Sequence, residues 1–484
     1  MIRRPLSTPL PSPSGTDRLG GANDLDALAP DTLARGSRRW TAKLRAMSIT
    51  VLVALAGCGD GDDGGSTGTS SAATSIGPTT STPTSEASGL TGTSDDSSTG
   101  AAPGTTLGES SDSGAASESG APDGPPTLVR IGETFVVPTL AASMPKRFAD
   151  AAHDAAGDVY LVVNGNGATS GSFVSADGAP LGQPFAVAET DAYTQGVRVW
   201  FGGAAFLVAW HDNRDAPNVS KLRGRLVAWD GGGPAFAGPD FVIGGDGTYS
   251  EMPPAIAWSA TTQTFMVVWH TGEAHDIAAQ RVAADGALVG GILPITADAD
   301  WQSDAGVAWH AGRDEWLVVY THAGATTEVR ARRLASDGAP IGEPATLTTA
   351  AGTWLAQATY VPDTADYLTA WFEGEMKARR VDADGVPLGD AFSLAPGYGN
   401  YDGYAVAYNA ASGTFAAVFH GTTDEDFALA FTVDGTTSAV LEATASRGAD
   451  GHFNPHVVAH STRPEWLLVT SLGFASVVAQ RLGE

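Results

Sequence analysis

Aromatic residues, several with carboxylates nearby, recur at a regular place in the sequence from residue 193 onward. Each aromatic lies six to nine residues before a second, regularly spaced ring. An aromatic face beside a carboxylate can stack on a sugar ring and accept hydrogen bonds from its hydroxyl groups. The alternative is that each ring fills a gap between neighbouring repeats. The candidate ligand-binding residues are Tyr193, Tyr249, Glu251, Trp301, Asp304, Trp354, Tyr401, Asp402 and Phe453.

The same acidic residues leave hydrolysis open as a second chemistry. Two carboxylates across a cleft are the usual catalytic device of glycosidases. The sequence contains no Ser-x-Asp-x-Gly-x-Thr-Trp box of the sialidase type. No residue is therefore assigned a catalytic role.

Four histidines lie close to the ends of apolar strands and at first sight suggest a ring of ligands for a metal ion. Zinc holds nitrogen ligands at about 2.0 to 2.1 Å. Equivalent positions in different repeats diverge from the axis around which the repeats are arranged, which places their side chains too far apart for one ion. The sequence therefore predicts no metal site and no cofactor. The four residues are His211, His270, His322 and His420.

A repeat of about 51 residues must position these side chains. An apolar run occurs seven times. A Trp, Tyr or His recurs upstream of each run and forms what we call the upstream column, and an Asp-Gly pair follows the run in six of the seven copies. Four strands per period, without a long 3.6-residue periodicity, are typical of β-propeller blades. The runs begin at Tyr160, Phe206, Phe265, Trp316, Tyr367, Phe415 and Trp466, and the upstream column is His153, Trp200, Trp258, Trp309, Tyr360, Tyr408 and His460.

The last repeat stops before its fourth strand. Residues 131–137 read like residues 181–187, the fourth strand of the first repeat. We therefore predict an all-β, seven-bladed β-propeller of four-stranded blades over residues 127–484, with the last blade completed by an N-terminal strand. Ring closure of this kind removes exposed sheet edges.

Arginines recur on the third strand of the repeat. They could form an anion-binding ring. We favour the interpretation that their aliphatic stems cover blade edges, while their guanidinium groups pair with surface carboxylates or carbonyls. The residues are Arg225, Arg281, Arg333, Arg380 and Arg481.

The only cysteine, Cys58, follows an uncharged run. Lys43 and Arg45 precede that run, which covers residues 46–57 and ends Leu-Ala-Gly before the cysteine. This layout is typical of a secretory signal and too short to span a bilayer. It resembles a bacterial lipobox, which predicts a signal peptide within residues 1–57 and a lipidated Cys58. The alternative is a chance apolar segment with a buried cysteine.

Residues 58–126 form a linker rich in Ser, Thr, Gly and Asp. From residue 59 onward it holds 10 acidic residues and no Lys or Arg. Such a segment buries too little apolar surface to fold, so we predict a disordered tether. Its r.m.s. span would be roughly 45 Å, from about 5 to 6 Å times the square root of its length.

The excess of acidic residues that gives the chain a formal charge of −27 lies after the signal segment. Residues 1–57 carry 8 Lys+Arg and 4 Asp+Glu, which leaves 19 Lys+Arg against 50 Asp+Glu in the remainder. This balance repels phosphate backbones, so we predict no nucleic-acid partner.

The repeat motifs resemble those of a known group of proteins. They include the run Trp210-His211-Asp212-Asn213-Arg214 and a Gln-Arg-Val-x-x-Asp-Gly stretch that begins at Gln280. The chain is similar to predicted seven-bladed propeller lipoproteins of soil delta-proteobacteria, which often carry Ser/Thr/Gly tethers. The resemblance implies the fold and export, and no chemistry.

Together these features predict an exported lipoprotein of the bacterial cell envelope, in the periplasm or on the outer surface. Its N-terminal lipid would bind the membrane, and its propeller would bind a glycan or protein at the channel-mouth face. The alternatives are a carbohydrate-active hydrolase at that mouth and a scaffold subunit of an outer-membrane assembly.

Overall fold

A computed structural model describes most of the chain after residue 123. The described residues are 124–140, 148–165, 168–188, 194–216, 219–248, 252–272, 275–397, 403–421, 425–444, 452–472 and 476–484. They form 29 strands and contain no helix, and hence no helix that could cross a membrane. The predicted signal segment, Cys58 and all but the end of the predicted linker lie outside them.

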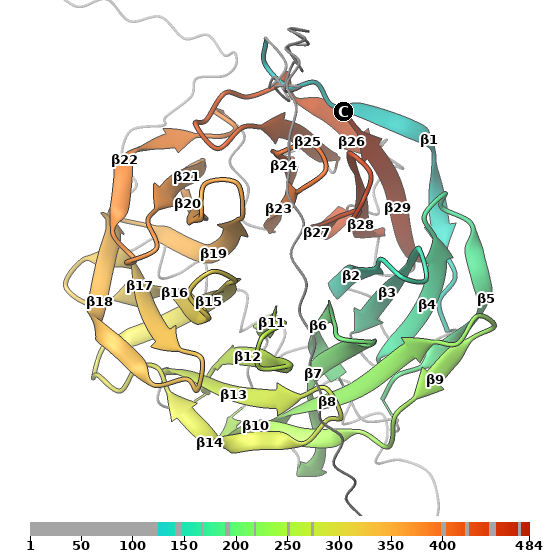
Figure 1. The fold of residues 1–484 in the computed structure, drawn as a ribbon, viewed down its shortest axis with the longest axis horizontal. Coiled ribbons are helices and arrows are strands. Elements are labelled where there is room, and N and C mark those ends of the chain that lie inside the picture. The colour runs from blue at the N-terminus through green and yellow to red at the C-terminus, as the bar shows by residue number, and fades with distance from the viewer. Residues whose placement is uncertain are drawn as a thin grey trace, which may run out of the picture. The chain divides into compact units, whose positions relative to one another are not determined.

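The strands form seven antiparallel sheets arranged as the blades of a propeller (Figure 1). Blade 1 comprises β2 to β5, and each later group along the chain forms the next blade around the ring. This confirms the predicted fold class. The innermost strands are β2 (Phe148–Asp154), β6 (Thr194–Gly202), β11 (Ala255–Ser259), β15 (Trp301–His310), β19 (Thr353–Val361), β23 (Tyr404–Asn409) and β27 (His452–Ala459).

The second strands are continuous apolar runs, because both of their faces pack against neighbouring blades. They are β3 (Val159–Gly165), β7 (Ala205–Ala216), β12 (Thr264–His270), β16 (Glu315–Ala323), β20 (Asp366–Glu373), β24 (Thr414–His420) and β28 (Glu465–Leu472). The third strands are β4 (Ser170–Ser175), β8 (Val219–Trp229), β13 (Ile277–Ala283), β17 (Thr327–Ala335), β21 (Met376–Val381), β25 (Asp426–Phe431) and β29 (Ser476–Gly483).

The outermost strands include one from the N-terminal end of the domain. They are β5 (Pro180–Ala186), β10 (Phe241–Thr248), β14 (Leu288–Pro294), β18 (Pro340–Thr349), β22 (Pro387–Ser393), β26 (Leu441–Thr444) and β1 (Val129–Val137). Blade 2 departs from the predicted four strands, because the short strand β9 (Pro234–Phe236) also pairs with β8.

Ring closure follows the prediction. β1 pairs with β29 and completes blade 7, so the cyan and dark red strands lie side by side in Figure 1. Gln480 on β29 reinforces the pairing, since its side chain donates to the carbonyl of Ile131 and accepts from the hydroxyl of Thr134 at 2.8 Å.

The hydrophobic core lies between blades rather than at the centre of the ring. Seven clusters of buried residues each span two adjacent blades, and the cluster between blades 7 and 1 includes Val137 of β1. The aromatic that opens each second strand is buried in all seven blades. Each blade therefore depends on its neighbours for burial of its apolar surface.

Strand pairing corrects two positions of the upstream column predicted from the sequence. Phe201 pairs with Phe206, and Ala459 pairs with Trp466, so Trp200 and His460 are each one residue out of register. A shift of one residue reverses the face of a strand. Trp200 is accordingly 45% exposed.

The Asp-Gly pairs form the turns that follow the third strands; in blade 2 this turn leads into the short strand β9. The glycine has a positive φ in each of the six, for example 88° at Gly286, which only glycine adopts readily.

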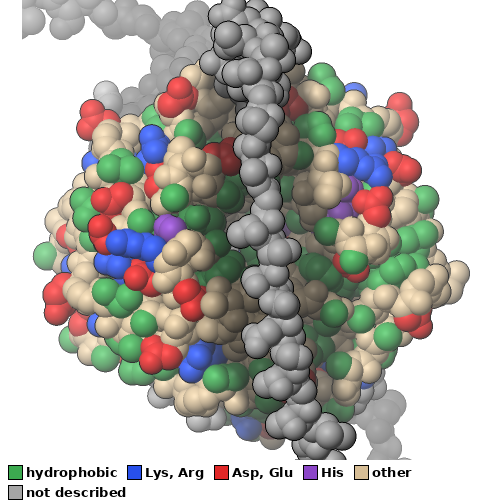
Figure 2. Space-filling model, in the orientation of Figure 1, with side chains coloured by type: hydrophobic (Ala, Val, Ile, Leu, Met, Phe, Trp, Pro, Cys, Tyr) green, Lys and Arg blue, Asp and Glu red, His purple; other side chains and the backbone are tan. Residues whose placement is uncertain are grey.

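Three of the five third-strand arginines, Arg333, Arg380 and Arg481, pair with a carboxylate as expected, whereas the buried Arg225 donates to backbone carbonyls and the Nε atom of Arg281 has no partner among the described residues. Arg333 donates to Glu315 at 2.7 Å, and Arg481 donates to Glu465 at 2.7 Å. On the face drawn in Figure 2, basic side chains lie in small groups beside Asp and Glu.

Successive strands of each blade run in opposite directions, so their connections lie on two opposite faces of the propeller. We call upper the face with the loops that lead into the innermost strands and that join second to third strands. The lower face carries the turns between first and second strands and between third and fourth strands.

Candidate functional site

The structure describes only part of the predicted ligand-binding set. Trp301, Asp304 and Trp354 are described in full, and Phe453 lies on β27 with only its backbone described. The remaining candidates lie outside the described residues, and so does the lipidation candidate Cys58. Those candidates are Tyr193, Tyr249, Glu251, Tyr401 and Asp402.

A backbone irregularity recurs where these residues meet the upper face. The pairing of β6, β15, β19 and β27 with the second strand of the blade shifts register there, as at a β-bulge. Each shift contains a residue with positive φ. These residues are Gly196, Asp304, Leu355 and Asn454.

Asp304 is directed by its bulge towards blade 5. Its carboxylate accepts hydrogen bonds from the Ser303 hydroxyl, at 2.9 Å, and from the backbone N–H of Leu355. Burial raises the pKa of Asp304 despite these two hydrogen bonds, and its Oδ1 atom has no partner among the described residues. The residue therefore links two innermost strands.

Trp354 packs into the core. Its ring meets Phe372 edge to face, with the ring centroids 5.6 Å apart, and it joins the hydrophobic cluster between blades 5 and 6. This contact matches the gap-filling interpretation for this residue.

Trp301 has a different environment at the start of β15. It is 47% exposed on the upper face. Its ring lies 5.1 Å from that of His275, which stacks on His270 at 5.4 Å. These three rings form an aromatic strip from blade 4 to blade 3. Burial, followed by the charge of His275, lowers the pKa of His270 to about 4, which keeps this part of the strip neutral at pH 7.

A histidine and two aspartates lie next to Trp301. Asp298, Asp300 and His322 each place one ligand atom within 4.8 Å of the others. The Nε2 atom of His322 is 3.3 Å from Asp300 Oδ2, and its Nδ1 atom is 3.2 Å from the amide nitrogen of Gln302. We call Asp298, Asp300, Gln302 and His322 the upper cluster.

A second histidine–aspartate group lies on the lower face between blades 7 and 1. His460 Nε2 is 2.9 Å from Asp158 Oδ1, and His153 Nε2 is 3.5 Å from the same atom. Arg463 donates to Asp158 Oδ2 at 2.8 Å. We call His153, Asp158, His460 and Arg463 the seam cluster.

Backbone donors fix the protonation of the seam cluster. The N–H of Ser461 points at Nδ1 of His153 at 3.3 Å, and the N–H of Arg463 points at Nδ1 of His460 at 3.1 Å. A ring nitrogen that accepts a hydrogen bond carries no proton, so both neutral rings carry theirs on Nε2. A metal on Nε2 would need the opposite tautomer, and the seam cluster therefore does not fit a metal site.

The seam contact belongs to a series of interblade hydrogen bonds on the lower face. In four blades, the last residue of the innermost strand or its neighbour accepts from its own turn and donates to the corresponding turn of the next blade. The donors and acceptors are Ser259 to Asp314 at 3.2 Å, His310 to Ala365 at 3.1 Å, Asn409 to Arg463 at 2.8 Å and His460 to Asp158 at 2.9 Å.

Polar residues also join innermost strands further inside the ring. Asp150 accepts the N–H of Val199 of blade 2 at 2.8 Å, and His456 Nδ1 lies 2.6 Å from its other oxygen. Burial alone would raise the pKa of Asp150, but His456, Arg198 and the N–H of Val199 outweigh it and lower the pKa. Gln357 makes a similar contact to Val406 of blade 6.

The tryptophan-containing motif of blade 2 forms an ion-pair network. The Trp210 indole donates to Asp212 at 3.0 Å, and Arg214 binds Asp212 at 2.7 Å and Asp240 at 2.8 Å. In blade 5, Trp371 donates to Glu373 in the same spacing. The motif therefore holds the end of the second strand in place.

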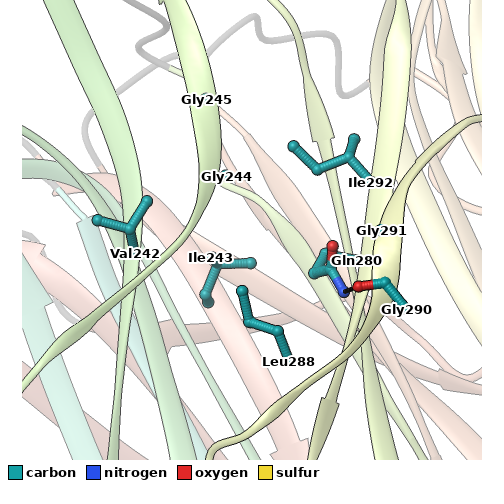
Figure 3. Close-up of a pocket in the computed structure, with 9 residues that line it drawn as sticks. All are labelled: Val242, Ile243, Gly244, Gly245, Gln280, Leu288, Gly290, Gly291 and Ile292. Carbon is teal, nitrogen blue, oxygen red and sulfur yellow. Dashed lines mark hydrogen bonds between the residues drawn. The ribbon is translucent and has the colours of Figure 1, made fainter.

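A groove of about 440 Å³ lies on the outer rim between β10 and β14 (Figure 3). Val242, Leu288 and Ile292 line it, and Gln280 is bound to the carbonyl of Gly290. None of its lining residues is charged, and none belongs to the predicted set.

Comparisons with known proteins match the chain at the level of structure only. No family model and no curated protein matches it. Raptor of Chaetomium thermophilum is 11% identical, with a TM-score of 0.47, over 75% of this chain and 29% of the Raptor chain. A protein of unknown function from Dyadobacter fermentans is 12% identical, with a TM-score of 0.44, over 74% of this chain and 99% of its own.

The sequence interpretation missed the upper cluster. It treated His322 as one member of a ring of equivalent histidines, whereas the partners of His322 come from its own blade. β15 and β16 pair with Gln302 opposite His322. An Asp-x-Asp run just before a strand, with a histidine at the far end of the next strand, was the available signal.

Proposed function

We propose that this chain is a lipid-anchored propeller of the bacterial cell envelope that binds a hydroxyl-bearing ligand, such as a glycan, on its upper face. The exposed indole of Trp301 carries the proposal. It offers a flat apolar face, and Asp298 and Asp300 beside it have half-exposed carboxylates that can accept hydroxyl hydrogen bonds.

Binding of the full-length chain to a glycan array tests the ligand class. We expect a bound glycan to be lost with Trp301→Ala and kept with Trp200→Ala. Trp200 is a matched control, because it is 45% exposed and lies near the lower end of β6. Equal binding by both variants would place the ligand elsewhere, and release of reducing sugar would favour the hydrolase.

The lipid anchor rests on Cys58 and the apolar run before it. We expect wild-type chain to sediment with membranes and to resist carbonate extraction, and Cys58→Ala to be soluble with an unchanged melting temperature. A Cys58→Ala chain that still resists extraction would overturn the anchor without touching the ligand proposal.

A further inference from the structure

We propose that Asp298, Asp300 and His322 bind a divalent transition-metal ion such as Zn²⁺ on the upper face of blade 4. Two ligands held at about 2.1 Å around a tetrahedral ion are about 3.4 Å apart. His322 Nε2 and Asp300 Oδ2 are 3.3 Å apart, and the three groups lie within 4.8 Å of one another. One imidazole and two carboxylates also leave coordination positions open.

The imidazole is buried and held in place. His322 is 4% exposed, and it pairs with Gln302 of β15 on one side and Glu328 of β17 on the other. Within the described part of the chain, its Nε2 atom makes no hydrogen bond of good geometry and points towards Asp300. The ring is thus fixed with this atom directed at the Asp300 carboxylate, and an ion held between the two groups would contact both.

The carboxylates lack a compensating cation. Among the described residues, no Lys or Arg pairs with Asp298 or Asp300. Asp276 adds a third carboxylate through Thr296, whose hydroxyl is 3.2 Å from it. Asp158 of the seam cluster, by contrast, is neutralised by Arg463. A divalent ion would supply the positive charge that the upper cluster lacks.

The neighbours of His322 can adapt to a metal. A metal on Nε2 requires a proton on Nδ1 and an acceptor for it. The amide of Gln302 can supply its oxygen by rotating half a turn, which turns its nitrogen towards the hydroxyl of Thr296. Without an ion, the same amide nitrogen donates to Asp298 and to the carbonyl of Asp300. The rotation gives up these two hydrogen bonds, a cost that ion binding must outweigh. Metal binding and rotation of this amide are therefore coupled.

Gly324 keeps the space beside the ligands open. A Cβ atom at this position would lie 2.9 Å from Asp300 Oδ2 and 3.1 Å from His322 Nε2. Its φ is not in the left-handed region, so alanine is acceptable to the backbone. Gly324→Ala is thus a variant that blocks the site while all three ligands remain.

Titration of chelator-treated full-length chain with Zn²⁺ by calorimetry tests the site without any glycan. We expect one ion per chain, with Kd raised about 100-fold by Asp300→Asn and at least about 10-fold by Gly324→Ala. Asp337→Asn, at an exposed lower-face turn of the same blade, should leave Kd unchanged. Melting temperatures of the variants confirm that they are folded.

Three results would overturn the proposal. The first is the absence of saturable Zn²⁺ binding at concentrations up to about 100 µM, because a preformed three-ligand site should bind Zn²⁺ with a Kd below that concentration. The second is binding that Asp300→Asn and Gly324→Ala leave unchanged in folded protein. The third is binding removed by His153→Gln, which would assign the ion to the seam cluster.

Discussion

Histidine and aspartate meet in two regions of this propeller, with different surroundings. In the seam cluster, backbone N–H groups occupy Nδ1 of both rings, and Arg463 neutralises Asp158. In the upper cluster, Nδ1 of His322 faces a side-chain amide, and the carboxylates have no cation among the described residues. The first arrangement joins two blades, and the second leaves ligand atoms available.

The difference shows that residue types alone do not define such a site. The groups that surround the rings decide which nitrogen carries the proton and whether the carboxylate is already paired. The seam cluster shares its position with Ser259, His310 and Asn409, which make the same interblade contact. The upper cluster has no such counterpart among the residues that the structure describes. Four predictions test this contrast.

Removal of β1 should have the largest effect, because it opens blade 7 beside the seam. A chain that begins at Ala141 loses the partner of β29 and the contact of Val137 with the blade 1 core. We expect its free energy of unfolding to fall by more than about 5 kcal/mol, beyond the usual range of single substitutions. A chain that begins at Pro125 should melt like the full-length protein, and equal melting temperatures for both truncations would contradict the role of β1.

Ring closure was predictable because each of the two observations behind it can be read from a short stretch of sequence. The last repeat visibly lacks a strand, and residues 131–137 resemble the strand that is missing. The upper cluster was not predictable in this way. Asp300 and His322 are 22 positions apart, and only the pairing of β15 with β16 brings them together. A one-residue misalignment at Trp200 arose because either of two adjacent rings, Trp200 or Phe201, fits the pattern.

The candidate aromatics illustrate the same limit. Trp301 and Trp354 lie at the starts of two innermost strands and look alike in the sequence, yet one is exposed and the other packs on Phe372. Strand register shows that they are not equivalent, because Trp301 lies three residues before Asp304 of its bulge and Trp354 lies directly before Leu355. Their environments depend on the bulges that follow, and Leu355 gave no sign of the positive φ that it adopts. Bulky residues are rare in that conformation, so no pattern of residue types predicts it.

Acid should destabilise the fold through the seam cluster below pH 6.5. Burial, followed by the charge of His460, lowers the pKa of His153 to about 4, although Asp158 and Asp154 oppose the shift. Between pH 6.5 and 4 the unfolded chain then binds more protons than the folded chain, so the free energy of unfolding falls as the pH falls.

The contribution of His153 should be roughly 3 kcal/mol, fully present above pH 6.5 and lost towards pH 4. Urea unfolding at several pH values measures it. His153→Gln should flatten this part of the profile while keeping a donor towards Asp158. Profiles of equal slope for the two proteins would show that His153 is not the group that titrates.

The same substitution in the two clusters gives the most direct comparison. Asp158→Asn weakens the acceptor of two buried rings and removes one of the two carboxylates that pair with Arg463, the other being Asp177, so it should cost about 1 to 3 kcal/mol. Asparagine tolerates the positive φ of residue 158. Asp300→Asn should change metal-free stability by less than about 0.5 kcal/mol. Equal costs in chemical denaturation would remove the distinction between a structural and an available cluster.

Trp301→Ala should have the smallest effect on stability and is the sharpest test of the upper face. An indole that is 47% exposed leaves no core cavity when truncated, so we expect the free energy of unfolding to change by less than about 1 kcal/mol. Trp354→Ala, which removes a ring from the cluster between blades 5 and 6, should cost about 2 to 4 kcal/mol. Denaturation curves of the two variants separate a surface ring from a packing ring at the starts of two innermost strands. A cost for Trp301→Ala as large as that for Trp354→Ala would mean that the aromatic strip supports the fold, and the proposed ligand would then lose its stacking platform.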